Sequence, residues 1–97
     1  MITTPVTVRN LLGLHARAAN VLAQEASLFT SVVELEDPSS QRKVDAKSIM
    51  QLLMLAAGQG SELILHTSGD DQDQANAGLK ALFAAGAGDP CGSVVPS

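Results

Sequence analysis

Along this chain of 97 residues, segments in which every second residue is apolar alternate with segments in which every third or fourth residue is apolar. Some segments alternate apolar and polar residues and are rich in β-branched types, which is typical of strands buried on one face. Others repeat apolar residues every three or four positions, which is typical of amphipathic helices. The segments follow one another as strand, helix, strand, strand, helix, strand, helix. A chain of this length forms one domain, so we predict that all the segments share one hydrophobic core.

The segments with the shorter period predict strands over residues 2–8, 30–36, 42–46 and 61–67. Pro5 lies inside the first strand, which predicts an edge strand or a position whose N–H is not needed in the sheet, because proline has no N–H to donate to a neighbouring strand. The sequence Asp-Pro-Ser-Ser at residues 37–40 is typical of a turn between the second strand and the third. We predict an α+β fold of the open-faced sandwich type, a four-stranded antiparallel sheet with three helices on one face (βαββαβα).

The three predicted helices differ in how much of their surface is apolar. The first begins at Ala16, the third follows Asp70, which we predict to cap it, and both are amphipathic. The second covers residues 47–57 and is apolar on nearly every side. Together the elements predict a domain over residues 1–88, followed by a flexible C-terminal tail over residues 89–97.

The second helix has more apolar residues than a helix on a single sheet can bury. Leu52, Leu55 and Ala56 form one stripe suited to the core. Three other apolar residues are then left to face outwards: Ile49, Met50 and Leu53. An exposed apolar patch with a flexible methionine is typical of a partner-binding surface, and a closely packed core helix is the alternative.

Composition excludes several classes of function. The chain has two Phe, no Tyr, no Trp and a formal net charge of −4, so we expect no nucleic-acid partner. One cysteine, Cys91, excludes an internal disulfide, and the two histidines are far apart in sequence, so we expect no metal and no cofactor. No apolar run reaches the roughly 20 residues of a membrane span. The N-terminus lacks the features of a signal peptide, so we expect a cytoplasmic protein without membrane contact.

One cluster has the chemistry of a phosphate site: Gly13, His15 and Arg17, at the start of the first helix. The free N–H groups of a first helical turn, together with the helix dipole, attract anions. A neutral imidazole nitrogen is a nucleophile towards phosphorus, and a guanidinium group binds phosphate oxygens. These residues indicate a histidine that accepts a phosphoryl group, with a chance placement of His15 as the alternative. His66 lies in a predicted strand and has less in favour of a chemical role.

Two motifs carry a resemblance to a known family, GLHARAA at residues 13–19 and KSIM at residues 47–50. The sequence resembles HPr, the histidine-containing phosphocarrier family of the bacterial phosphoenolpyruvate-dependent phosphotransferase system. The resemblance implies that His15 is phosphorylated on Nδ1 and that Arg17 binds the phosphoryl group. It further implies that Ser48 is a regulatory phosphorylation site and that the outward-facing residues of the second helix contact partners. The backbone at Ala16, Arg17 and Ala18 is expected to hold the phosphate.

The resemblance implies a phosphoryl carrier rather than an enzyme. Its expected partners are enzyme I, which donates the phosphoryl group, EIIA-type domains, which accept it, and a serine kinase/phosphorylase that acts on Ser48. We expect a monomer. Ala18 stands where much of the family has proline, and residues 10–12 are as similar to the nitrogen-related branch as to the sugar-uptake branch. The alternatives are a regulatory interaction module that acts mainly through the Ser48 face and a ligand-sensing domain, which would need a pocket.

Overall fold

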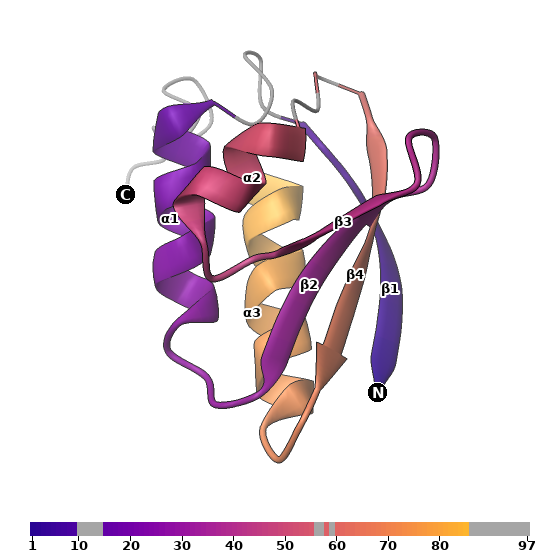
Figure 1. Cartoon of the computed structure of the whole chain (residues 1–97). Helices are drawn as coiled ribbons and strands as arrows, with labels where there is room; N and C mark the ends of the chain where they lie inside the picture. The colour runs from indigo at the N-terminus through magenta and orange to yellow at the C-terminus, as the bar shows by residue number, and fades with distance from the viewer. Residues whose placement is uncertain (10–14, 56–57, 59, 86–97) are drawn as a thin grey trace.

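The computed structural model describes residues 1–9, 15–55, 58 and 60–85 of the chain (Figure 1). Its elements follow the predicted order βαββαβα, which is confirmed. They are β1 (Ile2–Thr7), α1 (Ala16–Ala26), β2 (Val32–Asp37), β3 (Arg42–Asp45), α2 (Ile49–Leu55), β4 (Glu62–Ser68) and α3 (Gln72–Ala85). The predicted tail, residues 89–97, lies outside the described residues, so the predicted domain division stays a prediction.

The strands form one antiparallel sheet in the order β1-β4-β2-β3. β1 is an edge strand, which is one of the two positions that Pro5 predicted, and it pairs with β4 on its one partnered side. The central strand pair places Leu35 opposite Leu65, and both side chains are fully buried. The predicted open-faced sandwich is confirmed.

The three helices cover one face of the sheet and leave the other face open (Figure 1). Between the layers lies a single core, to which β2 and β4 contribute alternate residues, β1 and β3 contribute one residue each, and each helix contributes one stripe. Its largest fully buried side chains are Leu22, Leu35, Leu52, Leu63, Leu65 and Leu79, from all three helices and two central strands. Most of the core residues are Ala, Val and Leu, and Phe83 is the one aromatic residue in the core that the structure describes.

Two predicted helix starts are wrong by one or two residues. α2 begins at Ile49 rather than Lys47, because the hydroxyl of Ser48 accepts the Gln51 N–H and caps the helix. α3 is not capped by Asp70, because the carbonyl of Asp71 accepts the N–H of Ala75 and so occupies the cap position.

The carboxylate of Asp71 joins the start of α3 to the loop between α1 and β2. It accepts the backbone N–H of Thr30 at 3.0 Å and that of Ser31 at 2.9 Å, and it also accepts the Ser31 hydroxyl. These bonds, led by the one from the Ser31 side chain, lower the pKa of Asp71 from 3.8 to about 2. Glycine at position 69 allows Ser31 to lie this close to the start of α3. Gly69 has φ +147°, and a Cβ at this position would lie 2.6 Å from Ser31 Oγ.

Asp71→Asn is expected to lower the melting temperature of the protein at pH 7, because the amide is a weaker acceptor than the carboxylate. The folded-state pKa lies below the unfolded value, so this stabilisation is present above about pH 4 and is lost as the pH falls towards 2. Thermal unfolding followed by circular dichroism between pH 2 and pH 7 measures the difference between variant and wild type. The control Asp70→Asn removes the neighbouring exposed carboxylate, and a pH-independent deficit of Asp71→Asn would contradict the assignment.

Candidate functional site: the start of helix α1

His15 is the N-cap residue of α1. Its backbone is extended, with φ −93° and ψ −177°, and its carbonyl accepts the N–H of Ala19 at 2.9 Å. Its ring nitrogen Nδ1 accepts the N–H of Arg17 at 3.2 Å, as a side-chain oxygen does in most caps. The imidazole therefore lies over the first turn of α1. Residues 10–14, which include the predicted site residue Gly13, lie outside the described residues.

The hydrogen bond assigns different roles to the two ring nitrogens. Because Nδ1 accepts a hydrogen bond from a backbone amide, it carries a lone pair, and in the neutral ring the hydrogen sits on Nε2. Nε2 is buried and has no hydrogen-bond partner among the residues that the structure describes. The nucleophilic lone pair of His15 is thus on Nδ1 and points at the amides of the helix start.

The start of α1 is electrostatically suited to an anion. The N–H groups of Ala16, Arg17 and Ala18 have no carbonyl four residues earlier within the helix, and the first turn contains no acidic residue. Arg17 is exposed, and within the described ranges its guanidinium forms neither an ion pair nor a hydrogen bond. A phosphoryl group bound at Nδ1 would therefore meet amide hydrogens and a permanent positive charge.

Ser48 and Lys47 connect α2 to the rest of the fold. Ser48 caps α2 with its hydroxyl 3.3 Å from the backbone nitrogen of Gln51, so it precedes the helix rather than lying in its first turn. The Lys47 ammonium donates to the carbonyl of Phe29 at 2.9 Å, just beyond the end of α1. Ser48 is half-buried, and its hydroxyl faces the N–H groups at the start of a helix, as the ring of His15 does.

The outer side of α2 carries exposed apolar side chains. Ile49, Met50 and Leu53 are 39%, 78% and 39% exposed, as predicted, while Leu52 and Leu55 are buried. Ala56, predicted for the core stripe, lies outside the described residues. Met54 is 60% exposed and was missed, although it follows Met50 by four positions and so lies on the same side of the helix. We call Ile49, Met50, Leu53 and Met54 the α2 patch.

A groove with a volume of about 630 Å³ runs between α1 and the start of α2. Figure 1 shows α2 alongside α1, with the Leu55 end of α2 at the same end of the molecule as the start of α1. The groove brings Ser48 together with part of the α2 patch, but His15 does not line it. Its lining residues are Ala23, Gln24, Ser27, Leu28, Lys47, Ser48, Ile49 and Met50.

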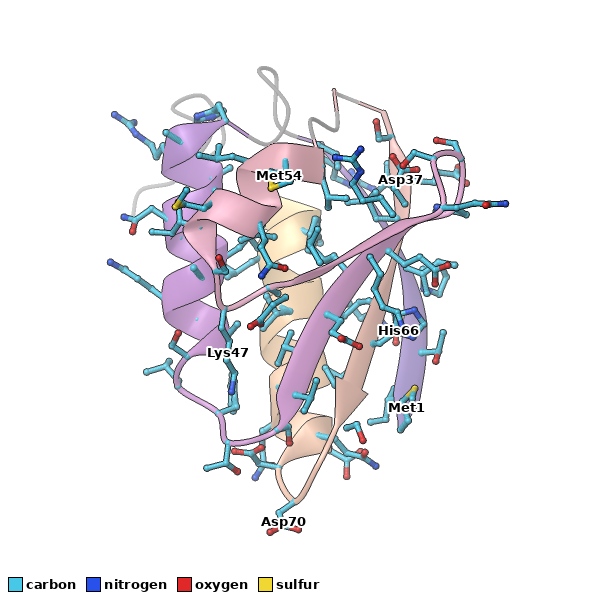
Figure 2. All side chains as sticks on the ribbon, viewed as in Figure 1. Met1, Asp37, Lys47, Met54, His66 and Asp70 are labelled. Atoms are coloured by element: carbon cyan, nitrogen blue, oxygen red, sulfur yellow. The ribbon has the colours of Figure 1, made fainter. Side chains whose placement is uncertain are left out.

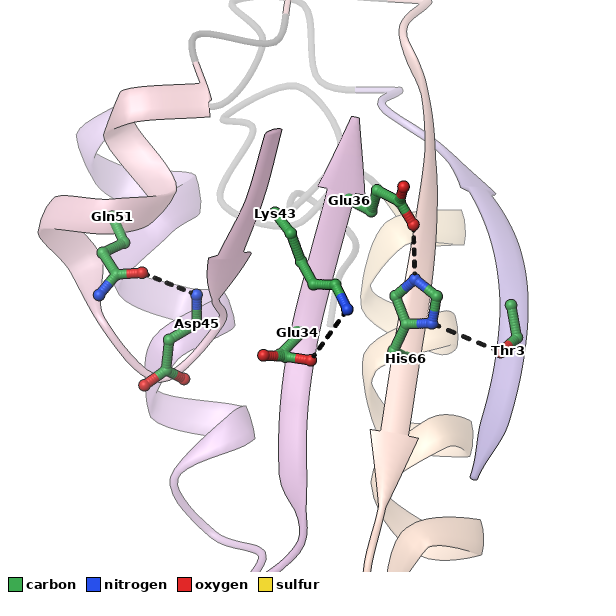
Figure 3. Close-up of polar contacts among 7 residues, drawn as sticks. All are labelled: Thr3, Glu34, Glu36, Lys43, Asp45, Gln51 and His66. Carbon is green, nitrogen blue, oxygen red and sulfur yellow. Dashed lines mark hydrogen bonds and ion pairs between the residues drawn. The ribbon is translucent and has the colours of Figure 1, made fainter. Parts of the chain in front are cut away.

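His66 lies on the open face of the sheet and is held at both ring nitrogens (Figure 3). Its Nε2 is 2.9 Å from the Glu36 carboxylate and its Nδ1 is 3.4 Å from the Thr3 hydroxyl. Both ring nitrogens of His66 are thus already in contact with other side chains, and a phosphoryl group could bind to neither without breaking a contact. The geometry therefore favours His15 as the phosphoryl acceptor. Among the described residues no group of three or more His, Cys, Asp or Glu could bind a metal ion, and no described helix is long and apolar enough to cross a membrane.

The chain is similar in sequence to a known family and to several of its members. Residues 2–85 match the family described as PTS HPr component phosphorylation site. The chain is 48% identical over 84 residues to the phosphocarrier protein HPr of Cupriavidus necator, which covers 87% of this chain and 92% of that protein. It is 43% identical over 84 residues to the HPr-like protein Crh of Halalkalibacterium halodurans, covering 87% of this chain and 94% of that protein.

Solved structures give the same result. HPr-C-His from Thermoanaerobacter tengcongensis superposes with a TM-score of 0.83 at 36% identity, over 89% of this chain and 94% of that one. Crh of Bacillus subtilis, a dimer with a swapped domain, superposes with a TM-score of 0.70 at 41% identity, over 90% of this chain and 98% of that one. The similarity therefore extends over nearly the whole length of both partners in each comparison.

Leu53→Glu is expected to change the free energy of unfolding by no more than about 1 kcal/mol, because its side chain is exposed. The matched variant Leu52→Ala, one position away on the buried side, is expected to lose about 2–5 kcal/mol. Urea unfolding at equilibrium measures both. A loss for Leu53→Glu as large as that for Leu52→Ala would mean that Leu53 belongs to the core.

Proposed function

The chain belongs to the HPr family of phosphocarrier proteins, and on this premise we propose that it accepts a phosphoryl group on His15 from phospho-enzyme I and passes it to an EIIA-type domain. The observation that carries the proposal is the orientation of His15 Nδ1 over the first turn of α1. In this role the protein is a carrier that is transiently phosphorylated and not an enzyme. Its place of action is the cytoplasm, where it meets both partners in turn.

Transfer forms one P–N bond while it breaks another. The Nδ1 lone pair of His15 attacks phosphorus in line with the phosphohistidine nitrogen of enzyme I, which keeps the electron pair of the breaking bond. The hydrogen bond from the Arg17 amide to Nδ1 breaks in this step, and the amide then donates to a phosphoryl oxygen. The amides of Ala16 and Ala18 and the Arg17 guanidinium stabilise the remaining charge. The reverse sequence delivers the group to the EIIA-type domain.

The α2 patch and the groove beside it are the proposed partner surface. The patch is exposed and apolar, and it lies on the helix that runs alongside α1. Lys47 lines the groove, and Arg17 is exposed at the start of α1, so both cations fit a partner whose interface has an acidic rim. A carrier has to leave one partner before it reaches the next, so we expect small interfaces and fast dissociation. The monomeric state stays a prediction, since the solved Crh relative is a swapped dimer.

His15→Asn is expected to abolish phosphoryl acceptance and to keep the fold, because asparagine caps a helix well but does not accept a phosphoryl group. Incubation with enzyme I and labelled phosphoenolpyruvate, with acid and base stability of the bound label, measures acceptance. The wild type and the control His66→Asn are expected to carry acid-labile, base-stable label. Label on His15→Asn equal to that on the wild type would refute the proposal.

A regulatory role through Ser48 is the second candidate. It is favoured by the position of Ser48, which lines the same groove as Ile49 and Met50, and by the similarity to Crh proteins. The two roles are compatible, since a phosphate on Ser48 would control access to the α2 patch without touching His15. A purely regulatory module would bind its partner through this face and would acquire no label from enzyme I. The labelling experiment therefore separates the two candidates.

Ser48→Asp is expected to lower the affinity for enzyme I by about tenfold or more and to leave the melting temperature unchanged or slightly higher. An aspartate still caps α2, and its charge lies at the positive end of the helix. A partner that buries the patch has to desolvate this charge. Titration calorimetry against enzyme I measures the affinity. Gln74→Glu, at an exposed position of α3, is the control for net charge. Equal losses for both variants would assign the effect to net charge rather than to the patch.

A further inference from the structure

We propose that Met50 and Met54 are an oxidation site, at which peroxide weakens the binding of a partner to the α2 patch. The inference rests on the proposed function, because it concerns the surface that enzyme I would cover. It is carried by the position of the two thioethers. Met50 and Met54 are four positions apart on α2, so both sulfur atoms lie on one side of the helix.

Exposure makes both sulfur atoms accessible to a small oxidant. Met50 and Met54 are among the most exposed large apolar residues that the structure describes, while the core between helices and sheet contains no methionine. Figure 2 shows Met54 on α2 and Met1 at the outer edge of the sheet, beside the N-terminal end of β1. Met1 is 74% exposed, so it reports on oxidation at a site remote from the patch.

The chemistry needs a hydroperoxide and no catalytic residue. A sulfur lone pair attacks one oxygen of hydrogen peroxide, so that an S–O bond forms and the O–O bond breaks. Sulfur loses two electrons, and the departing hydroxide takes the proton of the oxygen now bound to sulfur and becomes water. Each methionine thus consumes one peroxide molecule and becomes a sulfoxide, which methionine sulfoxide reductases return to the thioether.

The sulfoxides act on binding and not on folding. In the free protein both groups remain in water, because both side chains are largely exposed, and the buried stripe of Leu52 and Leu55 is untouched. In a complex the polar S–O groups would be removed from water against an apolar partner surface. We therefore expect an affinity loss of about tenfold at an unchanged melting temperature.

The experiment compares untreated and peroxide-treated protein in the Cys91→Ser background, because a thiol would also react with peroxide. Peptide mass spectrometry follows sulfoxide at Met1, Met50 and Met54, calorimetry gives the affinity for enzyme I, and circular dichroism gives the melting temperature. Oxidation is expected at all three methionines, with weaker binding, no change in melting temperature, and recovery after treatment with MsrA and MsrB. The control Met50→Leu/Met54→Leu keeps an apolar patch without sulfur and is expected to bind equally well before and after peroxide.

Three outcomes would overturn the inference. Equal affinity of the untreated protein and of protein oxidised at Met50 and Met54 would do so, as would a lower melting temperature that parallels the affinity loss. A loss of binding by the peroxide-treated double leucine variant would assign the effect to another residue. Untreated protein that fails to bind enzyme I and acquires no label from it would refute the proposed function as well, which separates that failure from the other three.

Discussion

A single layer of helices covers a single face of the sheet, and this constraint determines which side chains are buried. The two central strands bury alternate residues on the covered face, and Leu35 therefore lies opposite Leu65 in the centre of the sheet. Each helix can bury one stripe only, because its other side faces water. α2 has apolar residues on both sides, so its outer side chains remain exposed as the α2 patch. The proposed partner surface thus follows from the number of layers in the fold.

The three helices begin at residues whose roles differ although their positions are equivalent. His15, Ser48 and Asp71 each occupy the cap position of one helix. The start of a helix stabilises negative charge, since its N–H groups and its dipole point in the same direction. At His15 and Ser48 this property is available to a phosphate, whereas the Asp71 carboxylate is already bonded to Thr30 and Ser31. The caps of α1 and α2 are therefore suited to binding a phosphate, and the cap of α3 holds that helix against the loop between α1 and β2.

The environments of the two histidines show why residue type alone does not define a site. One ring nitrogen of His15 accepts a hydrogen bond from a helix amide. Arg17 lies two positions further along, and its guanidinium has no partner among the residues that the structure describes. His66 has a carboxylate on one nitrogen and a hydroxyl on the other, so its ring stabilises the open face of the sheet. The difference comes from neighbours on other strands, Glu36 and Thr3, which sequence spacing does not reveal.

The order of the elements, the buried stripe of α2 and the position of His15 at the start of α1 could be predicted from the sequence alone. Pro5 limited β1 to an edge or to a position whose N–H is not needed, and the outer side of α2 could be predicted without Met54. These features depend on hydrophobic period, on proline and on capping, which act over at most about four residues. Three features could be found only in the folded chain: Asp71 binds a loop 40 residues earlier, His66 pairs with Glu36, and Ser48 shares a groove with α1. Such contacts join residues that are distant in the chain, and they follow from sheet register and from helix packing, which no local pattern specifies.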